Sequence, residues 1–151
     1  MSVSARLAEL GIVLPPVAAP VAAYVPAVRA GDQIWTSGQL PFADGALTLT
    51  GKVGAGVTPE EAAEAARIAA LNAIAAAADK AGGVDAIRRV LKVVVFVASA
   101  PEFTGQPAVA NGASNLLGEI FGEAGVHARS AVGVSVLPLD APVEVELIVE
   151  A

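Results

Sequence analysis

The spacing of apolar positions predicts a long helix that begins after Thr58 and ends near Gly82. Thr58 suits the N-cap, Pro59 the first helical position, and Glu61 completes a capping box. Further along, apolar residues recur at steps of three and four positions, at Ile68, Leu71, Ile74 and Ala78. Most other positions are alanine, so the pattern leaves the opposite side of this helix undefined.

A β-branched run after this helix predicts a strand at the centre of a sheet. The run is "RRVLKVVVFVAS", residues 88–99, and its unbroken apolarity is typical of a strand covered on both faces. A second helix is expected near residues 108–123, with Leu116, Leu117, Ile120 and Phe121 on its apolar side. Two strands, "RSAVGVSVL" and "VEVELIVE", then close the chain around the turn "PLDAP".

The first sixty residues predict shorter elements. Residues 4–10 suit a helix that ends at Gly11, and the prolines between positions 15 and 20 exclude regular structure. "YVPAVRAGDQIWTSGQLP" indicates two short strands joined by a turn at residues 30–32. The chain therefore predicts an N-terminal arm, residues 1–20, and one α+β domain, residues 21–151, with its helices on one face of the sheet.

The strand after His127 begins with an arginine, which is unusual for an otherwise apolar strand. Alternation places the valines on one face, which we expect beneath the helices: Val132, Val134 and Val136. The other face carries Arg129 and small residues, and Glu144 and Glu146 would share it if the last two strands form a hairpin. Two interpretations stay open: the small residues admit a second subunit, or Arg129 forms an exposed cross-strand ion pair with one of these glutamates.

Composition narrows the class of protein. A chain of 151 residues suits one domain, and with 55% hydrophobic and 16% charged residues it is too apolar for a disordered chain. Proline, glycine or charge interrupts each apolar stretch before the ~20 residues of a membrane span, so we expect no membrane association. The absence of cysteine excludes disulfides and a thiol nucleophile and favours the cytoplasm.

Charge and residue types disfavour several kinds of site. A net charge of −6, with no basic cluster longer than Arg88 and Arg89, disfavours a nucleic-acid partner. No metal is expected, because a single histidine without cysteines offers a poor ligand set. Ser37 and Ser130 lack the arrangement that activates a serine nucleophile. His127, two residues before Arg129, is either a general base or ligand contact, or a structural loop residue.

Several stretches together resemble the reactive intermediate deaminase superfamily, the Rid or YjgF-like proteins. They span residues 20–151: "AAYVPAVRAGDQIWTSGQLP", "ALNAI", "RRVLKVVVFVAS", "HARSAVGVSVLP" and "VEVELIVEA". The arm and "NGASNLLGEIFGEAG" resemble a longer, less characterised branch. The resemblance implies a chorismate-mutase-like α+β domain, with a mixed sheet and two helices on one face, that forms homotrimers with clefts between subunits.

The resemblance also implies an activity, namely hydrolysis of enamines and 2-imino acids to 2-keto acids and ammonia, without a cofactor. Arg129 would grip the substrate carboxylate, and Glu144 would orient or deprotonate the attacking water. The remaining residues expected at the substrate are Tyr24, Ser37, Gly38, Ser130, Ala131 and His127. Ala131 replaces a cysteine common in the family, and either Asn111 or Asn115 matches its asparagine. These departures keep an alternative open, a non-catalytic protein that binds or senses a small carboxylate.

Overall fold

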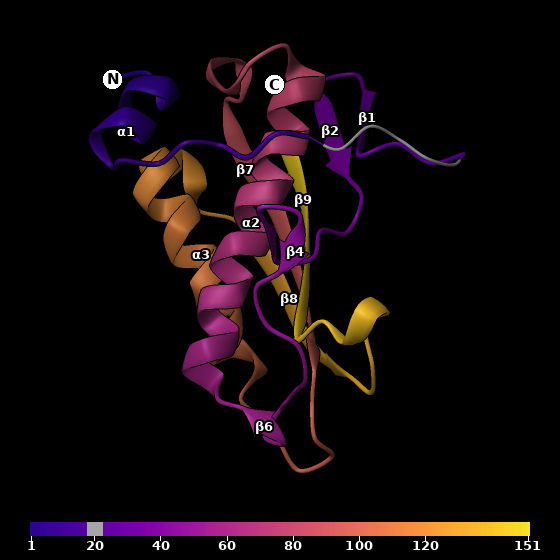
Figure 1. Cartoon of the computed structure of the whole chain (residues 1–151). Coiled ribbons are helices and arrows are strands. Elements are labelled where there is room, and N and C mark those ends of the chain that lie inside the picture. The colour runs from indigo at the N-terminus through magenta and orange to yellow at the C-terminus, as the bar shows by residue number, and fades with distance from the viewer. Residues whose placement is uncertain (18–22) are drawn as a thin grey trace.

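The structure, a computed structural model, describes residues 1–17 and 23–151. A mixed five-stranded sheet in the order β1-β2-β9-β7-β8 is covered on one face by two helices (Figure 1). Within this sheet β7 and β8 pair in parallel, and the other neighbouring strands pair antiparallel. The expected α+β fold is therefore confirmed. The sheet strands and covering helices are β1 Ala27–Ala30, β2 Gln33–Thr36, β7 Arg89–Ala98, β8 Ala128–Val134, β9 Val143–Glu150, α2 Pro59–Ala81 and α3 Gln106–Phe121.

Shorter elements complete the chain. The predicted first helix is present as α1, and the loop before α2 forms two small ladders. In the first ladder Asp44 and Gly45 adopt positive φ angles of 53° and 82°, as a tight two-residue turn requires. None of the helices in the described part of the chain is both long and apolar enough to cross a membrane. The bounds are α1 Val3–Glu9, β3 Phe42–Ala43, β4 Ala46–Leu47, β5 Lys52–Val53 and β6 Gly56–Val57.

Helix α2 begins as predicted, but its buried side matches the predicted apolar positions only in part. The Thr58 hydroxyl accepts from the Glu61 amide, and the Glu61 carboxylate accepts from the Thr58 amide, which completes the capping box. Ile68 and Leu71 are only partly buried. The fully buried positions are mostly alanines: Ala62, Ala66, Ala69, Ala70, Ala73 and Ala77. Ile74 and Ala78 are buried as predicted, so the apolar spacing indicated only part of the buried side. The rest of that side is alanine, whose small side chains let α2 pack closely on its neighbours.

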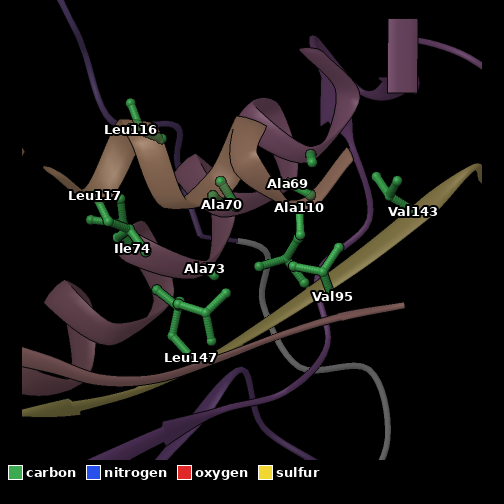
Figure 2. Close-up of a cluster of buried hydrophobic side chains, with 14 of the residues drawn as sticks. Ala69, Ala70, Ala73, Ile74, Val95, Ala110, Leu116, Leu117, Val143 and Leu147 are labelled. Carbon is green, nitrogen blue, oxygen red and sulfur yellow. The ribbon is translucent and has the colours of Figure 1, made fainter. Parts of the chain in front are cut away.

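Small residues also bring α2 and α3 into backbone contact. A Cβ atom at Gly112 of α3 would overlap the carbonyl group of Ala63 on α2. Figure 2 shows Ala69, Ala70 and Ala73 of α2 among the larger side chains of α3 and the sheet. Leu116 and Leu117 of α3 and Leu147 of β9 belong to the same core. The larger core side chains come mainly from α3 and the sheet, while the small residues of α2 allow its backbone to approach α3.

The middle strand of the sheet is β9, so the expectation that residues 88–99 form the centre is wrong. Strand β7 lies between β9 and β8 and is covered on one face only. Its residues Val93, Val95 and Val97 are fully buried, whereas Val94 and Phe96 remain partly exposed. A continuous apolar run cannot distinguish a strand covered by helices on both faces from one whose second face is open.

The two sets of side chains on β8 also face in the opposite directions to those predicted. Paired residues of adjacent strands lie on the same face, and Arg129 pairs with the buried Val93 of β7. Arg129 and Gly133 therefore face α3, whereas Val132 is 45% exposed on the uncovered face. Val136, expected in the core, is 66% exposed beyond the end of the strand. Because β8 pairs with β7 rather than β9, no hairpin forms from the last two strands.

The N-terminal helix packs against the rest of the chain. Leu7 is buried in the core cluster. The amide and hydroxyl groups of Ser4 donate to the Asp85 carboxylate at 2.8 and 2.6 Å, and Arg6 donates to the Glu119 carbonyl at 2.8 Å. The boundary between arm and domain at residue 20 stays a prediction, because residues 18–22 lie outside the described part of the chain.

Candidate functional site

Arg129 lies on edge strand β8 and is held by two side chains of α3. Its Nη1 atom donates to Asn111 Oδ1 at 2.8 Å and to Ser114 Oγ at 3.2 Å. Residues three positions apart share one face of a helix, so Asn111 and Ser114 meet the guanidinium together. Asn111, and not Asn115, is thus the asparagine beside the arginine.

These contacts leave one edge of the guanidinium free. An arginine side chain has five N–H donors, and the two on Nη1 are both engaged. Within residues 1–17 and 23–151, neither Nε nor Nη2 of Arg129 forms a hydrogen bond, and no carboxylate forms an ion pair with the guanidinium. The predicted ion pair with Glu144 or Glu146 is therefore wrong. The free edge offers two parallel donors, the geometry that binds a planar carboxylate.

His127 supports the same cluster from the loop before β8. Its Nδ1 lies 2.6 Å from the carbonyl oxygen of Gly125, and its Nε2 lies 2.9 Å from Ser114 Oγ. The imidazole is half-buried. Both ring nitrogens are therefore occupied within the chain, which agrees with the structural interpretation of this histidine.

A second group of predicted residues gathers around the turn that follows β2. Ser37 donates its hydroxyl hydrogen to the carbonyl oxygen of Val25 at 2.6 Å. The Glu144 carboxylate lies against the Cα of Gly38, where a Cβ atom would overlap it. Burial, followed by repulsion from the charge of Glu146, raises the pKa of Glu144 above the ordinary value for glutamate. Gly38 thus makes room for a carboxylate with increased basicity.

Tyr24 belongs to this second group. Tyr24 and Gly38 both line a cavity of about 310 Å³ that reaches Asn72 of α2. The tyrosine is 62% exposed. Asn72 donates to the carbonyl oxygens of Leu40 and Phe42, each at 3.0 Å, and so holds the loop that borders the cavity. The cavity is otherwise lined mainly by apolar residues, including Pro16, Val17 and Pro26.

The two groups are not brought together within one chain. Arg129 lies on the helix-covered face of β8, whereas Glu144 pairs with Phe96 and lies on the uncovered face of β9. Strand β7 separates the two strands. The expectation that Glu144 shares a face with Arg129 is wrong, for the same reason that the hairpin does not form. Ser130 and Ala131 follow this division: Ser130 is on the uncovered face, and Ala131 packs against the core.

The uncovered face of the sheet is largely apolar. Val28, Trp35 and Val132 are 51%, 47% and 45% exposed on three different strands. Between them lie partly exposed apolar side chains of β7 and β9, namely Val94, Phe96 and Ile148. Trp35 therefore lies on this surface and not in the core of the single chain.

The sequence prediction did not include Ser114, which contacts both Arg129 and His127. Its signal was the three-residue spacing of Asn111 and Ser114 on α3, which places both polar side chains on one face of the helix. Metal-binding groups of three or more histidine, cysteine or acidic residues do not occur among the residues that the structure describes.

Comparison with known proteins identifies the family. A model of the family described as "YjgF/chorismate mutase-like, putative endoribonuclease" matches residues 4–151. The chain belongs to this family. The resemblance inferred from the sequence motifs is thereby confirmed, together with the α+β fold that it implied.

Relatives of this family member cover nearly the whole chain. Protein TCP17 of Trypanosoma cruzi is 48% identical over 149 residues, which cover 98% of this chain and 93% of the relative. Atu1372 of Agrobacterium tumefaciens, a crystal structure of unknown function, is 45% identical over 98% of this chain and 91% of its own, with a TM-score of 0.90. Escherichia coli TdcF, crystallised with bound serine, shares the fold at 24% identity and a TM-score of 0.64, covering 91% of this chain and 94% of its own.

Proposed function

We propose that this protein hydrolyses enamine and 2-imino acid intermediates to 2-keto acids and ammonia in clefts between the subunits of a homotrimer. The observation that carries the proposal is the guanidinium of Arg129. Asn111 and Ser114 hold its Nη1 atom, which leaves the Nε and Nη2 donors free for a substrate carboxylate. A 2-imino acid places its reactive carbon next to that carboxylate.

Glu144 provides the second half of the chemistry. A carboxylate whose pKa is raised by burial is a stronger base than an ordinary glutamate. It takes a proton from water as the water oxygen bonds to the imine carbon, and the proton then passes to the nitrogen. The hydroxyl proton of the resulting carbinolamine then moves through the Glu144 carboxylate to the nitrogen as the C–N bond breaks, so ammonia leaves and the carbon keeps the oxygen as a ketone. Tyr24, Ser37 and Gly38 border this position, and Ser130 and Ala131 adjoin the arginine.

The arrangement of the faces favours a site shared between copies. Arg129 and Glu144 lie on opposite faces of one sheet, so both reach one substrate only if a neighbouring copy supplies one of them. The apolar uncovered face offers such a contact, and its burial favours association by ~25 cal/mol per Å² before the entropy cost. TdcF, which has the same fold, was crystallised with serine, a ligand that carries a carboxylate.

Arg129 variants test the proposed activity directly. An amino-acid oxidase generates 2-imino acids, and semicarbazide trapping follows their disappearance. We expect the protein to accelerate this loss, Arg129→Lys to retain a small part of the acceleration, and Arg129→Ala to lose it by about a hundredfold or more. No acceleration by the unmutated protein with any of several side-chain types would refute the deaminase activity.

Complementation between two inactive variants tests the shared site. Arg129→Ala and Glu144→Gln proteins are unfolded together in equal amounts and refolded. If each cleft takes Arg129 from one subunit and Glu144 from its neighbour, random mixing restores about a quarter of the activity. No recovery, with mixed trimers shown by mass spectrometry, would place both residues in the same subunit's site.

The alternative function uses the same arginine without chemistry. Ala131, in place of the cysteine common in related deaminases, favours a protein that binds a small carboxylate and does not transform it. Thermal shift with pyruvate separates the two functions, because a sensor is stabilised by pyruvate yet leaves the imine lifetime unchanged. Equal stabilisation of the Arg129→Ala variant would show that the ligand binds elsewhere.

A further inference from the structure

We infer that His127 is a positioning residue that acts through Ser114 to hold the guanidinium of Arg129 in one orientation. His127 Nε2 lies 2.9 Å from Ser114 Oγ, and Ser114 Oγ lies 3.2 Å from Arg129 Nη1. The imidazole does not touch the ligand. The inference rests on the proposed function only in taking the ligand to be a carboxylate.

The direction of each hydrogen bond among Gly125, His127, Ser114 and Arg129 follows from the Gly125 carbonyl group. The Gly125 carbonyl only accepts, so the 2.6 Å contact with His127 requires a hydrogen on Nδ1. In the neutral ring Nε2 then has a lone pair and accepts the hydroxyl hydrogen of Ser114. The Ser114 oxygen keeps its own lone pairs for the Arg129 Nη1 donor. Each of these hydrogen bonds therefore has one defined donor and one defined acceptor.

This order matters because a serine hydroxyl rotates freely when nothing directs its hydrogen. Without His127, the Ser114 hydrogen could turn toward Arg129, where it would repel the guanidinium donors. Asn111 alone would then hold Nη1 through a single contact. An exposed arginine fixed at two points presents the Nε and Nη2 edge before the ligand arrives, and such preorganisation strengthens binding.

The tautomer of His127 can be measured directly, because it is the only histidine in the chain. In protein labelled with ¹⁵N-histidine, we expect two-bond ¹⁵N–¹H correlation spectra at neutral pH to show a protonated Nδ1 and an unprotonated Nε2. Ser114→Ala should shift the Nε2 resonance, while Asn115→Ala, an exposed neighbour on the same helix, should not. A protonated Nε2, or no change in Ser114→Ala, would overturn the inference.

Two substitutions of His127 separate positioning from simple packing. His127→Asn keeps a donor for Gly125 but cannot reach Ser114, whereas His127→Gln can offer an amide oxygen to the Ser114 hydroxyl. We expect His127→Asn to raise KM, or the Kd for pyruvate, about tenfold with a smaller change in kcat, and His127→Gln to recover most of this loss. Equal losses in both variants would overturn the inference.

The two measurements also distinguish failure of this inference from failure of the proposed function. If the unmutated protein neither hydrolyses imines nor binds pyruvate, the carboxylate site is wrong, and the histidine spectra still decide the positioning role. If it does bind pyruvate and His127→Asn binds it equally well, the site stands and the role of His127 is refuted.

Discussion

Strand β9 shows both faces of the sheet within eight residues. On one face, Val143, Val145 and Leu147 are at most 1% exposed beneath the helices. On the other face, the alternate residues Glu144, Glu146 and Ile148 are only half-buried. Both sets come from the same segment of sequence, so the difference arises entirely from what covers each face.

The sheet of the single chain therefore has one face that is buried and one that is largely uncovered. The helix-covered face is a finished core, and burial of its side chains supplies most of the stability of the single chain. The uncovered face combines apolar side chains with Glu144 and Glu146. Under the proposed function, those apolar side chains hold copies together and Glu144 reaches the substrate.

The largest expected difference between the faces comes from adjacent positions of β9. Leu147→Asp would bury a charge without a partner and should reduce the free energy of unfolding by about 4 kcal/mol or more. Ile148→Asp should cost less than about 1.5 kcal/mol but weaken association of the copies. Urea unfolding at equal protomer concentration, with light scattering, measures both. Similar losses of stability at the two positions would contradict the division of the faces.

The next effect concerns the helix layer that covers the buried face. Gly112→Ala should destabilise the protein by about 2–3 kcal/mol, because the added methyl group meets the backbone of Ala63, which cannot move aside alone. Gly118→Ala is the matched control on the same helix. Nothing lies within 4 Å of a Cβ at Gly118, so this change should be neutral or stabilise by up to about 1 kcal/mol. The reverse order in thermal or urea unfolding would show that the helices are not in backbone contact.

A smaller effect should appear on the uncovered face, in activity rather than in stability. The methyl group of Gly38→Ala would displace the Glu144 carboxylate, a flexible side chain that can move without disturbing the core. We expect kcat/KM for imine hydrolysis to fall about tenfold, with less than about 1 kcal/mol lost in unfolding. Gly118→Ala again serves as the control. Unchanged kinetics in Gly38→Ala would remove Glu144 from the reaction.

The smallest effect concerns the pH dependence of the proposed reaction. Glu144 must be ionised to act as a base, so activity should rise with pH through its pKa, which burial and then Glu146 raise above the ordinary glutamate value. Glu146→Gln removes the second cause and should move this acidic limb of kcat/KM to lower pH. Glu150→Gln, on the same strand, should leave the limb in place. A limb unmoved by Glu146→Gln would show that another group titrates.

The same shift has a defined sign for folding. A carboxyl group with a raised pKa binds its proton more tightly in the folded than in the unfolded chain. The folded protein therefore loses stability as pH rises from the ordinary glutamate pKa through the raised value of Glu144. Glu146→Gln should reduce this loss, since it lowers the pKa of Glu144 toward its ordinary value.

Features that depend on neighbouring residues were determined by the sequence itself. The start of α2 needs only Thr58, Pro59 and Glu61, whose contacts lie within one turn, and the prediction was confirmed. The motifs around Ser37 and Arg129 were sufficient to indicate the family. Residue types also indicated an arginine as the candidate carboxylate-binding group and a glutamate as the candidate base, although not how they are placed.

Only the tertiary structure decided which face each of those residues occupies. Alternation along β8 divides its side chains into two sets, but it does not tell which set faces the helices. That direction follows from parallel pairing with β7, whose paired residues lie 36 positions earlier in the chain, as Lys92 does for Ala128. The pairing turned Arg129 toward Asn111 and Ser114, exposed Val132, and separated Arg129 from Glu144. Contacts between distant segments have no local pattern, so the sequence could supply the functional groups while the fold alone arranged them.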